Sequence, residues 1–162
     1  MLSIVPILEK IESTELSTAI REGGLPYPII GGIHLLAIAL FGGMVLVTNL
    51  RLLGWGIEWW RVSELVQQLR LWKWAGFVVV TITGLLLAWS EPVKLYRSPS
   101  FCIKMVLFLM LGVHAIVFRR DVYGNTTALD KRLTLNAKLA AACSMILWAG
   151  LVVFGRWIAL DD

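Results

Sequence analysis

Four long apolar runs constrain this chain more than any other feature of its sequence. They cover roughly residues 28–53, 74–90, 100–118 and 139–159, and each is near the ~20 residues that a helix needs to cross ~30 Å of hydrocarbon. Of 162 residues, 58% are hydrophobic and 16% are charged, whereas about a quarter of a typical soluble domain is charged. The runs therefore predict an all-α protein, an integral membrane four-helix bundle that contacts the lipid bilayer.

Basic residues are unevenly divided between the two sides of this bundle. The connections between spans 1 and 2 and between spans 3 and 4 hold nine, and the other side holds six: Arg51, Arg61, Arg70, Lys73, Arg119, Arg120, Lys131, Arg132 and Lys138 against Lys10, Arg21, Lys94, Arg97, Lys104 and Arg156. By the positive-inside rule, we expect both termini on the outer (periplasmic) side of a bacterial inner (cytoplasmic) membrane. Since topology accounts for these cations, nucleic acid is not expected as a partner.

The segment before the first span has a different character. Residues 1–24 contain charged side chains between apolar positions at helical spacing, such as Leu8, Leu16 and Ile20. This pattern predicts an interfacial amphipathic segment of one or two short helices, with Ser13 able to cap the second. Residues 25–162 then form the four-helix domain.

The two histidines of the chain, His34 and His114, both lie inside predicted spans. An ionisable residue at membrane depth is costly and marks a functional site by default. Both lie beside glycine, which lets a neighbouring helix or a flat macrocycle approach closely. Because neutral imidazole is the commonest metal ligand, we expect His34 and His114 as candidate iron ligands of haem b. The alternative is that each histidine makes a hydrogen bond between helices.

Depth separates the two histidines. If spans 1 and 3 run in the same direction, His34 lies about 9 Å and His114 about 20 Å below the outer boundary, at ~1.5 Å per residue. Axial ligands of one haem should lie at similar depth, so whether the two share a haem stays open. Lys104 and Arg156 are expected near the level of His34, where they could pair with haem propionates, anionic lipid or a quinone carbonyl, or extend to the headgroups. An ion pair of Glu91 with either cation is a further alternative.

Several short motifs together resemble those of an uncharacterised bacterial family of small four-span membrane proteins, known as a domain of unknown function. The resemblance covers roughly residues 13–160. Its motifs are Tyr27-Pro28-Ile29-Ile30, Ile33-His34-Leu35-Leu36, Leu50-Arg51-Leu52-Leu53-Gly54, Val62-Ser63-Glu64-Leu65, Trp74-Ala75-Gly76-Phe77, Thr83-Gly84, Ile103-Lys104-Met105 and Gly155-Arg156-Trp157-Ile158-Ala159. The resemblance implies a four-helix membrane bundle and no established activity. It implies histidine at the position of His34 and often another polar residue at that of His114, which favours His34, Lys104 and Arg156 as the site.

The leading hypothesis is a membrane protein that binds b-type haem and transfers electrons at the outer face of the membrane. Hydrolase, nucleotide-binding and metalloprotease motifs are missing from the sequence, so catalytic activity of its own is not expected. The first alternative is a cofactor-free accessory or assembly subunit of a larger membrane complex. A quinone-binding or metal-binding membrane protein is the second alternative, and a homo-oligomer would be compatible with the small residues Gly42 and Gly43 of span 1.

Overall fold

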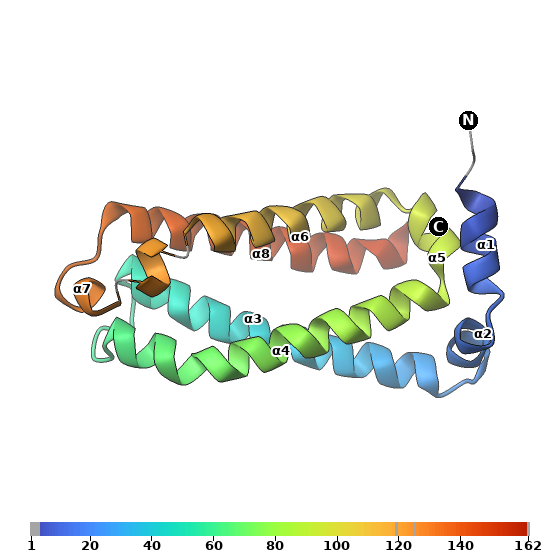
Figure 1. Ribbon diagram of the computed structural model, residues 1–162, viewed down its shortest axis with the longest axis horizontal. Helices are drawn as coiled ribbons and strands as arrows, with labels where there is room; N and C mark the ends of the chain where they lie inside the picture. Colours follow the sequence, from blue (N-terminus) through green and yellow to red (C-terminus); the bar gives the residue numbers. More distant parts are fainter. Residues whose placement is uncertain (1–3, 119, 125, 162) are drawn as a thin grey trace.

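The computed structural model describes residues 4–118, 120–124 and 126–161. Four long helices run antiparallel along one axis (Figure 1): α3 (Pro26–Leu53), α4 (Val62–Ser90), α6 (Pro99–Val117) and α8 (Leu135–Trp157). Each is long and apolar enough to cross a membrane. The described residues form no strand. The prediction of an all-α membrane bundle with four spans is therefore confirmed.

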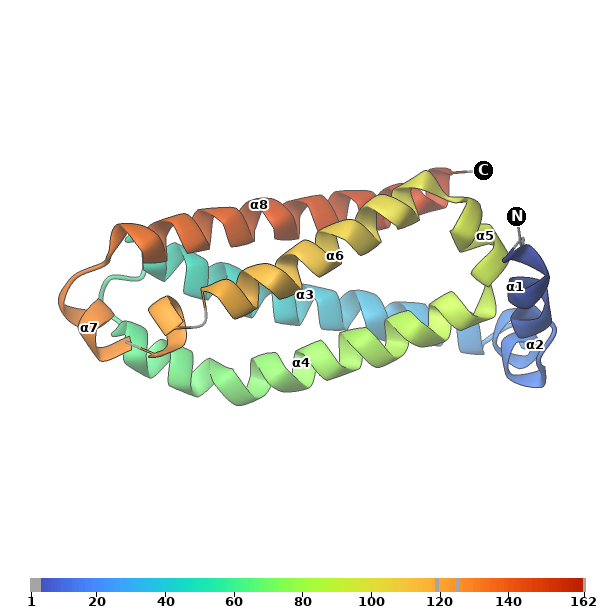
Figure 2. The same cartoon turned by 45° about the horizontal axis from the view of Figure 1, so that its top comes forward.

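Short helices cover the two ends of the bundle (Figure 2). At one end, called the α1 end below, lie α1 (Val5–Glu12), α2 (Glu15–Glu22) and α5 (Pro92–Arg97), together with both termini of the chain. At the opposite end, the α7 end, lie the π-helix η1 (Arg120–Gly124) and α7 (Thr126–Lys131). The 3₁₀ turn η2 (Ile158–Leu160) follows α8. Both termini thus lie on the same side of the bundle, as an even number of spans requires.

The N-terminal segment forms two short helices that lie across the bundle axis at the α1 end (Figure 1). Thr14, rather than Ser13, caps the second helix, because its side chain accepts a hydrogen bond from the Ser17 amide at 3.4 Å. The buried Ser17 hydroxyl and the Arg21 guanidinium both donate to the Ser90 carbonyl, at 3.0 and 3.2 Å. These bonds satisfy a carbonyl at the end of α4 that has no partner within the helix. They fix α2 to the last turn of a membrane helix.

Helix α4 is longer than its apolar run. It begins at Val62, twelve residues before the run that starts at Trp74. The polar stretch between Ser63 and Arg70 is therefore the first part of the same helix that forms the second span. Its first turn packs into a cluster of buried apolar side chains at the α7 end. The cluster consists of Leu52, Val62, Val66, Val122, Leu129, Ala137, Ala140 and Ala141. Three alanines of α8 allow close packing there, which stabilises the start of α4 outside the apolar run.

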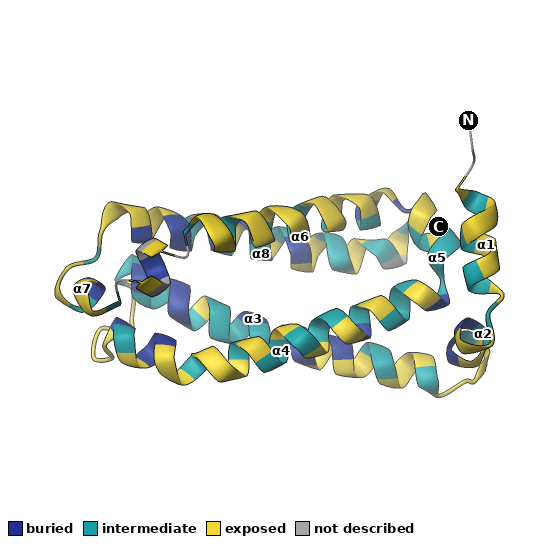
Figure 3. Ribbon diagram, in the orientation of Figure 1, coloured by how far each residue is buried: buried dark blue, intermediate teal, exposed yellow. Residues whose placement is uncertain are grey.

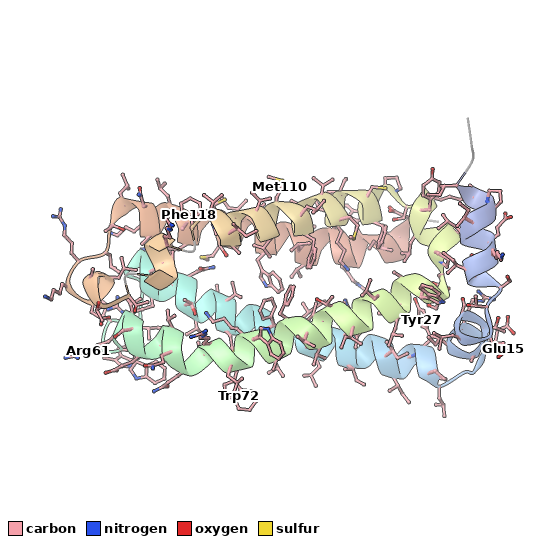
Figure 4. The ribbon with its side chains drawn as sticks, in the orientation of Figure 1. Glu15, Tyr27, Arg61, Trp72, Met110 and Phe118 are labelled. Carbon is pink, nitrogen blue, oxygen red and sulfur yellow. The ribbon has the colours of Figure 1, made fainter. Side chains whose placement is uncertain are left out.

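Helix packing divides the bundle into two pairs. α3 packs closely against α4, α6 packs against α8, and α3 also contacts α8, whereas α4 and α6 approach each other only slightly. Buried positions form narrow stripes between helices and the outer faces are exposed (Figure 3). Exposed faces carry large apolar side chains, including Trp72 and Met110, which point away from the bundle (Figure 4). An apolar exterior around a partly polar interior is what a lipid environment favours.

Asp161, the last residue but one, joins the segment after η2 to the start of α6. Its carboxylate accepts hydrogen bonds from the Ser98 hydroxyl at 2.5 Å, the Ser100 amide at 2.9 Å and the Ser100 hydroxyl at 3.0 Å. The bonds from Ser98 and Ser100 hold the pKa of Asp161 below its ordinary value of 3.8. They stabilise the charged carboxylate only in the folded state.

We therefore expect Asp161 to make stability depend on pH in the acid range. Its contribution is present above the ordinary pKa and is lost as the pH falls through the lowered pKa of the folded state. Thermal unfolding of the purified protein from about pH 6 to about pH 3 measures this, and Asp161→Asn is the control. The variant should unfold at lower temperature than the wild type near pH 6 and show a smaller further loss in acid. Equal acid sensitivity of the two proteins would contradict the role given to Asp161.

Candidate functional site

His34 of α3 is hydrogen-bonded to Thr83 of α4. Its side chain is buried, with 9% of the residue exposed, and its Nδ1 lies 2.8 Å from the hydroxyl of Thr83. That hydroxyl lies 2.6 Å from the Val79 carbonyl, to which it donates its only proton. It must therefore accept from His34, so the proton of the neutral ring is on Nδ1. Nε2 keeps the lone pair, which makes Nε2 the atom able to coordinate a metal.

The other membrane helices complete the surroundings of this ring. Gly84 of α4 lies against it, because a Cβ at this position would be 3.1 Å from His34 Cε1. The ammonium of the partly buried Lys104 of α6 lies close enough to His34 for an electrostatic interaction. Its Nζ also faces Gly155 of α8, where a Cβ would be 3.6 Å away. We call His34, Thr83, Gly84, Lys104 and Gly155 the His34 site; it draws on all four membrane helices.

A layer of aromatic rings lies next to this site. Phe41 of α3 contacts Phe77 of α4 and Trp148 of α8, with ring centroids 6.2 and 5.3 Å apart. Phe77 stacks on Phe108 of α6, with centroids 6.3 Å apart. In every helix the ring lies between four and seven residues from the member of the His34 site, in the direction of the α7 end. One ring from each helix thus closes the His34 site toward the middle of the bundle.

Beyond the aromatic layer lies a second group of polar contacts. Asn49 Nδ2 donates to Ser144 Oγ at 3.0 Å, and Lys73 Nζ donates to Thr48 Oγ1 at 2.9 Å. Asn49 and Thr48 are buried. The sequence alone predicts Lys73 only as a topology residue, because it precedes the apolar run. Its position on the continuous helix α4 brings it to Thr48 instead.

His114 belongs to this second group. Its Nε2 lies 2.9 Å from the Ala140 carbonyl, which can only accept, so this nitrogen is the donor. The bond joins α6 to α8, and the ring also contacts Phe118, with centroids 4.9 Å apart. His114 follows Lys104 by ten residues on α6, which is about 15 Å along the helix. The depth difference predicted from the sequence is therefore present, and the geometry does not favour a haem shared by His34 and His114.

The remaining candidates take different positions. Lys104 lies with His34, as expected, whereas Arg156 is exposed and no contact links it to the His34 site among the described residues. Its neighbour Gly155 faces the bundle interior, and one residue along a helix turns the side chain by about 100°. Glu91 accepts a hydrogen bond from Tyr27 at 3.1 Å, so the structure gives it a partner other than the two cations considered above.

The chemistry open to the His34 site follows from these groups. The described part of the chain contains no group of three or more histidine, cysteine, aspartate or glutamate side chains able to hold a bare metal ion. A single oriented imidazole is nevertheless the usual protein ligand of a haem iron, and the macrocycle supplies the other ligands. A cation beside it suits a carboxylate. The donor set therefore fits haem better than a free metal ion.

Comparison with known proteins adds the family but no activity. A family model described as "Family of unknown function (DUF6644)" matches residues 11–161. This range contains the four membrane helices and every residue of the His34 site. Neither a curated protein nor a solved structure matches the chain.

Proposed function

Because the chain belongs to this family of unknown function, we propose an activity from its own residues: it is a membrane protein that binds b-type haem at His34 and transfers electrons. The observation that carries the proposal is the fixed orientation of His34. The Thr83 hydroxyl accepts a hydrogen bond from Nδ1–H, which places the lone pair of the neutral ring on Nε2, the atom that would coordinate iron. Haem ligands in proteins are commonly oriented in this way by a hydrogen bond from their other nitrogen.

The position of Lys104 supports haem rather than a smaller ligand. Gly84 and Gly155 have no side chains, so His34 and Lys104 pack directly against the backbones of α4 and α8. Lys104 would pair with a propionate. Bound there, haem would supply one-electron redox chemistry. The positive-inside bias would direct the α1 end, and with it the His34 site, to the outer side of a bacterial inner membrane.

Titration of the purified, folded chain with haem tests this proposal. We expect saturable binding of one haem per chain. The growth of an absorption band in the Soret region measures this binding. The affinity should fall when Lys104 is replaced by Met, a side chain of similar length without charge. Binding that does not saturate, or that a detergent micelle without protein reproduces, would overturn the proposal.

Thr83 has a positioning role, which Thr83→Val tests. Valine keeps the shape of threonine but cannot accept a hydrogen bond from Nδ1–H, so the ring loses its fixed tautomer. Loss of such a partner typically lowers metal affinity by about 10- to 100-fold. We expect that decrease in haem affinity together with a changed reduction potential, and recovery of both in Thr83→Ser. If Thr83→Val binds haem like the wild type, Thr83 does not position His34.

A cofactor-free accessory subunit is the second candidate, and one observation favours it. Four of the polar contacts join different helices: His34–Thr83 and Lys73–Thr48 join α3 to α4, Asn49–Ser144 joins α3 to α8, and His114–Ala140 joins α6 to α8. Such bonds hold membrane bundles together without any ligand. In this case His34→Ala would lower stability or recovery of a partner complex, and the wild type would bind no haem. The His34 and Lys104 groups would also suit a quinone carbonyl, which analysis of co-purified lipids tests.

A further inference from the structure

Two concave surfaces meet at the α7 end of the bundle. The first is an open pocket of about 240 Å³ between the loop after α3 and the segment after α7. Its lining includes three basic side chains, Arg51, Lys131 and Arg132. The second is an apolar groove of about 300 Å³ between α3 and α4, with Leu40, Gly43 and Val47 on its α3 side. Gly43 opens this groove, because nothing lies within 4 Å of the position that its Cβ would take.

One face of α3 connects the two surfaces. Leu40, Gly43 and Val47 lie three or four residues apart, and Arg51 follows Val47 by one more turn. The groove and the basic pocket are thus successive parts of one stripe. From Leu40 to Arg51 this stripe is about 16 Å long, which is close to the ~15 Å depth of hydrocarbon in one leaflet. Trp60 belongs to the groove lining, and its carbonyl accepts from Arg51 Nε at 2.6 Å.

The charges of the pocket favour an anion. Arg51 uses Nε for Trp60, so its two Nη atoms point to no described partner and are available to a ligand. Of the two carboxylates that line the pocket, Asp130 accepts hydrogen bonds from the amide and the hydroxyl of Ser63, at 3.0 and 2.5 Å, and faces α4. Glu58 is exposed. The three cations of the pocket therefore outnumber its two carboxylates, of which Asp130 is already engaged by Ser63.

The depth of the pocket identifies the kind of anion. Trp55, Trp59 and Trp60, in the same loop, are exposed by 65%, 79% and 42%, and exposed tryptophans of membrane proteins lie at the level of the headgroups. We propose that this stripe binds one anionic phospholipid of the adjacent leaflet, with an acyl chain in the groove and the phosphate beside Arg51 and Arg132. Basic pockets at this depth are typical sites for anionic headgroups. This inference is independent of the haem proposal.

Native mass spectrometry of the full chain with defined lipids tests the site. Phosphatidylglycerol should be retained in preference to phosphatidylcholine, and each of Arg51→Gln and Arg132→Gln should reduce this preference about fivefold. Arg132 is exposed, so its loss leaves the fold intact even if Arg51→Gln disturbs the Trp60 loop. Glu58→Gln should increase the preference, a gain that misfolding cannot produce.

Further variants separate the acyl chain from the phosphate. Gly43→Leu fills the groove and should reduce retention of phosphatidylglycerol, whereas Gly112→Leu, at an equally open glycine on the exposed face of α6, should not. Inorganic phosphate is the second probe. If it displaces phosphatidylglycerol or binds equally well without lipid, the pocket is a site for soluble phosphate and the lipid proposal is overturned. Equal retention of the two lipids by the wild type would overturn it as well.

Discussion

His34→Ala is expected to abolish haem binding by the folded chain. The substitution removes the only imidazole on the α1 side of the aromatic layer, and with it the Nε2 atom that we assign to the iron. It leaves no new polar group without a partner, because the Thr83 hydroxyl still donates to the Val79 carbonyl at 2.6 Å. Haem per chain, measured by absorbance and pyridine haemochrome, should therefore fall to background while the helix content by circular dichroism is kept.

His114→Ala is the matched control for this result. It also removes one histidine from a membrane helix, but His114 donates to Ala140 beyond the aromatic layer. We expect it to keep its haem and to lose about 0.6–1.7 kcal/mol of stability with the hydrogen bond, and a further amount with the ring contact to Phe118. Equal loss of haem in both variants would show that both histidines are ligands. Full haem content in His34→Ala would contradict the assignment of the site.

Gly42→Ala should destabilise the bundle more than the addition of a single methyl group suggests. A Cβ at this position would lie 2.3 Å from Trp148 Nε1 and 2.7 Å from two carbons of the same ring. Trp148 cannot easily withdraw, because it packs edge-on against Phe41 with centroids 5.3 Å apart. The extra methyl group must therefore push α3 and α8 apart at the aromatic layer. Forced overpacking of this kind costs about 1–3 kcal/mol.

Gly43→Ala, one residue further on, isolates this steric cost. Both variants gain the same helix propensity, at most about 1 kcal/mol, but nothing lies within 4 Å of a Cβ at position 43. In thermal unfolding of the purified protein, Gly43→Ala should equal or exceed the wild type, and Gly42→Ala should be less stable than Gly43→Ala by about 1–3 kcal/mol. Similar stability of the two variants would contradict the close contact of α3 and α8. The structure thus assigns Gly42 to packing within one chain.

Features that depend on one helix at a time could be predicted from the sequence. The four membrane helices follow from apolar runs, and Pro26, Pro92 and Pro99 lie in the first turns of their helices, where a missing amide proton costs nothing. The difference in depth between His34 and His114 follows in the same way from counting residues along their spans. The start of α4 at Val62 could not be predicted from the apolar run, because contacts with α7 stabilise this part of the helix outside the run.

Features that depend on the rotation of one helix against another could not be predicted. The sequence shows Thr83 and Lys104 to be polar residues within apolar spans, but only the packing of α3 against α4 shows that Thr83 meets His34. The sequence predicts Arg156 only near the level of His34, and the packing of α8 gives the inward position at that level to Gly155 and leaves Arg156 exposed. The aromatic layer also went unpredicted, although Phe41, Phe77, Phe108 and Trp148 lie at matching depths when the residues of each span are counted.

The absorption spectrum of the protein as purified from haem-supplemented cells, without added haem, tests the central claim most directly. The claim predicts a Soret band and a pyridine haemochrome that corresponds to one b-type haem per chain, both lost in His34→Ala and both kept in His114→Ala. A folded wild-type protein with no Soret band and no haemochrome would contradict it, and the polar contacts of His34 would then serve helix packing alone.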